Sequence, residues 1–191
     1  MSVLADEAGT HAGRDDVRVI ATVLVEHRWL TTTALVLLVV LGPAVGYWLT
    51  DRPRLAGAAA LLSLVPVAAL TLVPTSRDLA VGCAVEWATP SLGAVEPMAN
   101  LVLFVPPALF LGVALRRPIA VLVGASAVSA LIELAQAFLT GLGRSCSTND
   151  WLSNTLGAAL GAGLAVAALW LRSYVDRSRE SSDRATVDAR V

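Results

Sequence analysis

Five long segments of the chain are almost free of charge, and short polar stretches separate them. The segments are 30–49, 55–73, 98–115, 118–140 and 151–171. Each has 18 to 23 residues, and a helix needs about 20 mainly apolar residues to cross the hydrocarbon core of a bilayer. None shows the alternation of a strand, and only helices or closed barrels satisfy their backbone polar groups in lipid. The pattern therefore predicts an all-α polytopic membrane bundle with five transmembrane helices.

Prolines interrupt three of these spans. We expect Pro43 and Pro66 to kink the first and second helices. Pro106 and Pro107 are adjacent in the third span, and a proline pushes the residue before it out of the helical region, so we expect irregular backbone at Val105–Pro106. Interrupted helices often line binding sites in membrane proteins, but a kink without a function is an equally good interpretation.

Charge is concentrated at the two ends of the chain and in the short connections. Residues 1–28 form a polar N-terminal tail, 29–171 the transmembrane bundle, and 172–191 a charged C-terminal tail. Because 1–16 and 176–191 are poor in large apolar residues, we expect both stretches to be disordered. The first span lacks a small-x-small cleavage site, so we interpret it as a retained anchor and not as a signal peptide.

The composition agrees with a membrane protein and argues against other classes. Residues of the set AVILMFWYC make up 56% of the chain and charged residues 15%, whereas soluble domains carry about 25% charge. The net charge is −1, and no arginine stripe alternates with aromatic residues, so we expect no nucleic-acid partner. Both histidines, His11 and His27, lie in the N-terminal tail, so we expect no metal and no cofactor.

Arginine counts predict the orientation. With five spans, the N-terminal tail and the loops 74–97 and 141–150 share one face, which holds five arginines against nine on the other. The five are Arg14, Arg18, Arg28, Arg77 and Arg144; the nine are Arg52, Arg54, Arg116, Arg117, Arg172, Arg177, Arg179, Arg184 and Arg190. Because cytoplasmic loops carry the excess of basic residues, we expect a multi-pass protein of the cell membrane with its N-terminus outside and its C-terminus cytoplasmic.

This topology places both cysteines on the outer face. Cys83 lies in the 74–97 loop and Cys146 in the 141–150 loop. An oxidising compartment favours pairing, and two cysteines allow one intramolecular bond. We therefore expect a Cys83–Cys146 disulfide, with two free thiols as the alternative.

Polar residues form one stripe along the fourth span. Ser126, Ser129, Glu133, Gln136 and Thr140 are spaced by 3, 4, 3 and 4 residues, which places them on one helix face. Glu133 is the one ionisable residue well inside a span, and such residues usually face the bundle interior or a cavity. It lies about 10 Å from the outer end of the helix, at 1.5 Å per residue.

Other polar residues fall at the same depth, and we take six as candidate binding residues. They are Asn100, Glu133, Gln136, Arg144, Asp150 and Asn154. One interpretation is structural, with a buried Glu133–Arg144–Asp150 ion-pair network and amides that join helices. The other is a pocket for a polar headgroup or a glycan, which we favour because buried ion pairs are costly as glue alone.

The fifth span carries two further local expectations. Asn154, Gly157 and Gly161 form a small-residue seam, which we expect to let the fifth span approach the fourth closely. Thr148 or Asp150 is expected to cap its N-terminus.

The ordered set of these residues resembles the VanZ-like family of bacterial membrane proteins over about residues 55–171. The resemblance is carried by Asn100 to Pro106 (NLVLFVP), Ser129, Ile132, Glu133, Gln136, Arg144, Asp150, Asn154 to Gly157 (NTLG), Gly161 and Thr71 to Pro74 (TLVP). The chain departs from the family at Pro107, where glycine is common. It also lacks a second acidic residue that family members often have before Asn154, which weakens any two-carboxylate mechanism.

The resemblance implies a role in the cell envelope, because the family is named for a member linked to resistance to teicoplanin-type glycopeptide antibiotics. The absence of lysine fits GC-rich coding and an actinobacterium. We expect membrane lipids as partners, and an outer-face pocket for a lipid headgroup, a cell-wall precursor or a glycopeptide. Two alternatives stay open: a membrane enzyme that uses Glu133 or Asp150 as acid or base on a lipid-linked substrate, and a small transporter.

Overall fold

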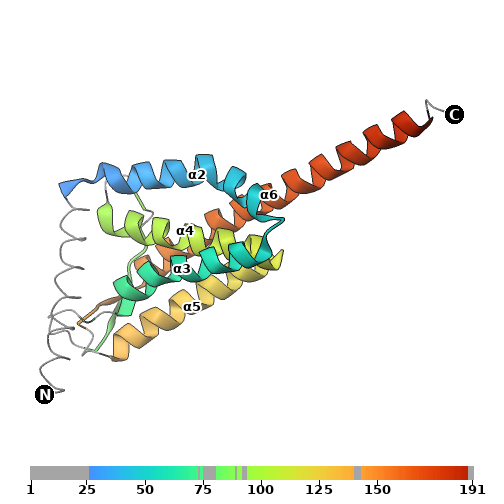
Figure 1. The fold of residues 1–191 in the computed structure, drawn as a ribbon. Coiled ribbons are helices and arrows are strands. Elements are labelled where there is room, and N and C mark those ends of the chain that lie inside the picture. The colour runs from blue at the N-terminus through green and yellow to red at the C-terminus, as the bar shows by residue number, and fades with distance from the viewer. Residues whose placement is uncertain are drawn as a thin grey trace, which may run out of the picture.

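A computed structural model describes residues 26–72, 74, 81–88, 90–91, 94–139 and 143–188. The five predicted spans are confirmed as helices that are long and apolar enough to cross a membrane. They are α2 (Trp29–Leu49), α3 (Pro53–Leu72), α4 (Val95–Leu115), α5 (Pro118–Phe138) and α6 (Thr148–Asp188). Figure 1 shows these helices side by side, with α6 running on beyond the bundle.

Helices α4 and α6 form the centre of the bundle. Small residues on α6 allow this close approach: Ala158, Ala165 and Ala168 have no exposed surface. A Cβ atom on Gly157 would overlap the carbonyl oxygen of Leu101, and one on Gly161 would overlap that of Val105. The close packing predicted for Gly157 and Gly161 is therefore real, but these two glycines meet α4 and not α5. Helical periodicity shows which residues share a face, but not which neighbour that face meets.

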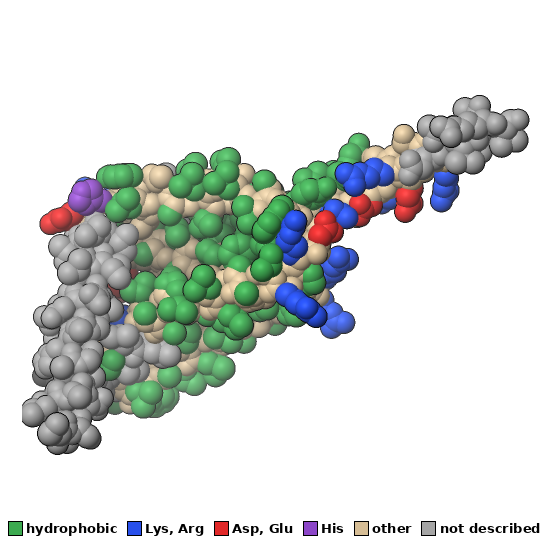
Figure 2. Space-filling model, in the orientation of Figure 1, with side chains coloured by type: hydrophobic (Ala, Val, Ile, Leu, Met, Phe, Trp, Pro, Cys, Tyr) green, Lys and Arg blue, Asp and Glu red, His purple; other side chains and the backbone are tan. Residues whose placement is uncertain are grey.

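The other three helices pack around this central pair and expose large apolar side chains. In α3, Leu61 and Leu62 are 70% and 72% exposed, while Ala56 and Ala60 of the same helix are buried. A surface of this kind on a helix of membrane-spanning length faces lipid. Figure 2 shows apolar side chains over the body of the bundle and arginines gathered near one end.

The prolines do not interrupt the helices. Pro43 and Pro66 lie inside α2 and α3, and α4 continues through Pro106 and Pro107. The expected irregularity at Val105–Pro106 is therefore wrong. Val105 is fully buried and its carbonyl lies against Gly161, so packing against α6 holds this part of α4 in a helical conformation.

The C-terminal tail also differs from the prediction. We expected disorder from residue 176, but α6 continues to Asp188. Its 41 residues make a helix of about 60 Å, roughly twice the hydrocarbon core. The segment has no glycine or proline after Gly163, and Arg172 pairs with Asp176 one turn along at 3.0 Å, both of which favour a helix. Residues 1–16 lie outside the described residues.

Two very short strands, which the sequence analysis did not predict, join the loops at one end of the bundle. Strand β1 (Cys83–Ala84) pairs in parallel with β2 (Cys146–Ser147), so that Cys83 lies opposite Cys146. The predicted Cys83–Cys146 disulfide is present, with the two Cα atoms 4.5 Å apart. We call this end, where 81–88 meets 143–150, the disulfide end.

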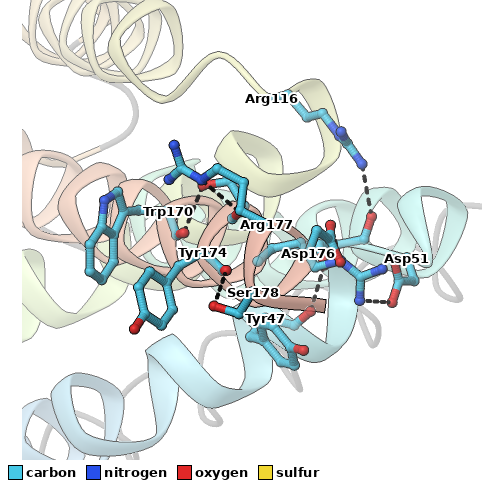
Figure 3. A network of polar contacts seen from close by, with 11 residues as sticks. Tyr47, Asp51, Arg116, Trp170, Tyr174, Asp176, Arg177 and Ser178 are labelled. Carbon is cyan, nitrogen blue, oxygen red and sulfur yellow. Dashed lines mark hydrogen bonds and ion pairs between the residues drawn. The ribbon is translucent and has the colours of Figure 1, made fainter. Parts of the chain in front are cut away.

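The opposite end, where α2, α4 and α6 meet the turns 50–52 and 116–117, is called the arginine end. Arg172 of α6 contacts Asp51 at 2.7 Å, and Arg116 donates to the carbonyl oxygen of Thr50 at 3.4 Å. Figure 3 shows these contacts together with the stacked rings of Trp170 and Tyr174. The arginine end is thus held by polar contacts between turns and α6.

Candidate functional site

The polar stripe of α5 faces the bundle interior, as predicted. Ser129, Glu133 and Gln136 are buried, with 0%, 7% and 7% of their surfaces exposed. Ser126 is half-buried, and Thr140 lies outside the described residues. An inward polar stripe needs partners on the neighbouring helices, and the structure provides them.

Three hydrogen bonds join the stripe to α6. Asn154 donates from Nδ2 to Oγ of Ser129 at 2.9 Å, and the hydroxyls of Ser126 and Thr155 are 3.0 Å apart. The indole N–H of Trp151 donates to the carbonyl oxygen of Ser126 at 3.2 Å. These bonds fix the α5–α6 pair at the disulfide end and hold the Trp151 ring in one orientation.

Two more candidates join other helix pairs. Asn100 of α4 donates to Oδ1 of Asp150 at 2.8 Å, and Gln136 of α5 donates to the carbonyl oxygen of Thr71 in α3 at 3.0 Å. The predicted cap of α6 by Thr148 or Asp150 is wrong, because Ser147 accepts the Asn149 N–H through its hydroxyl at 3.1 Å. Asn100, Gln136, Asp150 and Asn154 thus all bond between helices.

The contacts of Glu133 differ from those of the other candidates. Its Oε2 accepts the backbone N–H of Ser147 at 2.9 Å, which links α5 to the disulfide-bearing strand. The two ion pairs found among the described residues both involve Arg172, and the Glu133–Arg144–Asp150 network stays a prediction. Arg144 is half-buried, two residues before Cys146.

Glu133 also borders a cavity of about 420 Å³, which we call the Glu133 cavity. The wall from α5 is formed by Ala130, Glu133, Leu134, Ala137 and Phe138, and the opposite wall by Val81, Gly82, Cys83, Cys146, Ser147, Thr148 and Trp151. Ligand sites commonly have volumes of 300–1,000 Å³ and mainly apolar walls with a few polar groups. Of the six predicted binding residues, Glu133 is the one among the described lining residues.

The segment 81–88 is fixed over the cavity by more than the disulfide. Thr148 bonds both the N–H and the carbonyl of Glu86, and Asn149 accepts the N–H of Ala88 at 3.2 Å. Trp87 packs edge to face on Trp151, with the ring centroids 6.3 Å apart. Neither this segment nor Trp151 was predicted to belong to the site, although an aromatic residue at a span end is itself typical of a membrane interface.

Among the described residues, no group of three or more His, Cys, Asp or Glu is placed to hold a metal ion. The arrangement instead offers one carboxylate at the wall of an apolar cavity, beneath a covalently fixed segment. This geometry can bind and orient an amphiphile, with an apolar part in the cavity and a polar part at the carboxylate.

The fold and its polar interior define a polytopic α-helical membrane protein. Comparison with protein-family models matches residues 29–171 to the VanZ/LLP1 family, and the chain belongs to that family. The match includes α2 as well as the region of residues 55–171 that carried the resemblance. Neither the curated proteins nor the solved structures yielded a match.

Proposed function

We propose that the protein binds the polar head of a cell-envelope amphiphile at the Glu133 cavity. The amphiphile is a lipid, a lipid-linked cell-wall precursor or a glycopeptide such as teicoplanin. The observation that carries the proposal is the position of Glu133. This residue lies inside the α5 span and lines a cavity of about 420 Å³. A buried carboxylate is costly as structural glue alone, and its position at a cavity gives it a use.

We further propose that the disulfide end faces outward. The described arginines support this orientation, because eight belong to the arginine end and its continuation into α6, while Arg28 and Arg144 belong to the other side. The eight are Arg52, Arg54, Arg116, Arg117, Arg172, Arg177, Arg179 and Arg184. The excess predicts a cytoplasmic arginine end, and a disulfide is favoured at the opposite, oxidising side.

The lining of the cavity favours binding over the two alternatives. Asp150 is held by Asn100 and is not among the described lining residues, so these residues offer Glu133 without the second carboxylate that a two-carboxylate mechanism needs. The described lining comes from the disulfide end alone, whereas a transporter needs access from both sides of the bilayer. These two observations favour a binding protein whose cavity opens at one end of the bundle.

The test compares cells with no protein, the wild type, Glu133→Gln or Glu96→Gln, at matched membrane abundance. Glu96 is an exposed acidic residue of α4 at the same end and serves as the matched control. We expect the wild type and Glu96→Gln to change the binding of fluorescent teicoplanin and to reduce susceptibility, and Glu133→Gln to behave as cells without the protein.

A second measurement covers the lipid and precursor possibilities. Lipids retained by the purified wild type and by Glu133→Gln are compared by native mass spectrometry. We expect the wild type to retain an amphiphile that the variant loses. The proposal is overturned if Glu133→Gln changes neither teicoplanin binding nor the retained lipids while its abundance and thermal stability match the wild type.

A further inference from the structure

The walls of the Glu133 cavity restrict the chemistry of its ligand. Leu134 and Phe138 line the cavity, yet they are 53% and 66% exposed on a helix of membrane-spanning length. The cavity therefore borders the lipid-facing surface, and a hydrocarbon chain can enter it sideways from the bilayer. Glu133 lies five residues before Phe138, about 7 Å deeper along α5.

Among its described lining residues, the cavity offers an acid and no base. Glu133 is the one ionisable side chain among the described lining residues, and Asp150 is a second acid at the same end, held by Asn100. Phosphate recognition uses arginine, lysine or helix N-termini. The N-terminus of α6 borders the cavity at Thr148, but the Ser147 N–H is bonded to Glu133 and the Asn149 N–H to Ser147, and the carboxylate repels a phosphate. A cation satisfies a carboxylate in apolar surroundings, where an uncompensated charge is costly.

The hydrogen-bonding capacity of Glu133 points to the same ligand. A carboxylate has about four acceptor positions, and the Ser147 N–H uses one of them, at Oε2. An ammonium group carries several N–H donors in addition to its charge.

Trp151 provides an independent indication. Its ring lines the cavity, and its N–H is engaged by Ser126, so the ring is fixed in place. Aromatic faces attract cations within about 6 Å of the ring centroid. A carboxylate and a fixed indole in one apolar cavity are both complementary to a positively charged head.

We propose that the Glu133 cavity selects an amphiphile with an ammonium headgroup, whose hydrocarbon chain lies against Leu134 and Phe138 and whose nitrogen donates to Glu133. This inference rests on the proposed function and names its ligand class. It distinguishes an ammonium head from the phosphate head of a lipid-linked precursor.

The test uses the full-length protein in micelles of an uncharged alkyl maltoside, which carries no ammonium group, and the fluorescence of Trp151. Three single-chain amphiphiles of equal length, brominated on the chain, carry an ammonium, a hydroxyl or a phosphate head. Bromine quenches tryptophan at short range, and subtracting the signal of Trp151→Phe isolates the cavity. We expect saturable quenching by the ammonium compound at a concentration about tenfold below that of the alcohol, since a charge-assisted hydrogen bond contributes at least this factor, and the weakest quenching by the phosphate.

Two matched pairs of variants locate the effect. Glu133→Gln keeps an acceptor for Ser147 and is expected to bring the ammonium compound to the level of the alcohol, while Glu96→Gln keeps the preference. Ala130→Leu fills the cavity and is expected to abolish saturable quenching by all three compounds. Ala127→Leu adds the same bulk on an exposed position of α5 outside the described lining and is expected to bind like the wild type.

The outcomes separate the two proposals, and the headgroup series compares three ligands on the wild type with Trp151→Phe as the background. One outcome is saturable quenching that Ala130→Leu removes, with no preference for the ammonium head in the wild type. This outcome overturns the ligand class and leaves the proposed binding site standing. Quenching by all three compounds that never saturates, or that Ala130→Leu leaves unchanged, overturns both.

Discussion

At the disulfide end a covalent bond joins two loops and buried hydrogen bonds join the helices, whereas at the arginine end the ion pair that connects Asp51 to α6 is partly exposed. The Asn154–Ser129 bond is between buried side chains. The Arg172–Asp51 pair has side chains that are 28% and 51% exposed. Buried, satisfied polar networks hold a structure in one arrangement, while exposed ion pairs contribute little. The disulfide end is therefore the one built to hold a defined site.

The two ends also differ in how closely α6 approaches its neighbours. Toward the disulfide end, Gly157 packs directly against the backbone of Leu101. Toward the arginine end, a Cβ on Gly46 would lie 2.8 Å from the Cβ of Ala168, so the close contact there is with a side chain. A backbone can yield to added bulk only if the whole helix moves, so substitutions at Gly157 should affect the fold most.

The largest effect is expected for Gly157→Ala. The new methyl group overlaps the Leu101 carbonyl, and overpacking usually costs about 1–3 kcal/mol, with larger values where nothing can move. We expect loss of most monodisperse protein after extraction, and a lower thermal midpoint in what remains. Gly46→Ala should lose less, and Gly163→Ala, which meets nothing within 4 Å, should match the wild type. Equal behaviour of Gly157→Ala and Gly163→Ala would refute the close α4–α6 approach.

Removal of the disulfide is expected to have the next largest effect. Disulfides typically contribute 2–4 kcal/mol, and we expect about 2 kcal/mol for Cys83→Ser with Cys146→Ser. The lower end of the range applies because much of the 63-residue separation is occupied by α4 and α5, which remain helical in lipid. Thermal unfolding of the wild type with reductant should reproduce the double variant, and the variant should not respond to reductant. Loss of stability without any effect of reductant on the wild type would assign the cysteines a packing role only.

The disulfide also illustrates what could be predicted from the sequence. Span lengths set the number of crossings, and the parity of the crossings placed Cys83 and Cys146 on one face. The same arithmetic and the 3–4 spacing of the α5 stripe correctly placed Glu133 inside the bundle. These predictions needed only local properties of the chain: hydropathy, period and position along a span.

The errors concern choices that depend on tertiary contacts. Gly157 and Gly161 were predicted to face α5, but they face α4, because a small-residue face can serve any neighbouring helix. Val105–Pro106 was predicted to be irregular, but burial against Gly161 keeps α4 helical. Ser147 caps α6 in place of Thr148 or Asp150, since β2 sets where the helix begins. The cavity itself forms because the segment 81–88 folds over α5. The spacing of residues along the chain does not predict this contact.

The smallest effect is expected for Asp51→Asn at the arginine end. The substitution removes one of the two acids that contact Arg172, but Asp176 remains at 3.0 Å from its Nε. The side chains are partly exposed, and exposed ion pairs contribute little and are screened by salt. We expect the thermal midpoint to change by at most about 2 °C at low salt, with no difference from the wild type at 1 M salt. Asp176→Asn is the matched control, because it removes the other acid of the pair. If either substitution lowers the midpoint as much as loss of the disulfide does, the arginine end is as important to stability as the disulfide end. The distinction between a rigid site-bearing end and a loosely held arginine end would then be wrong.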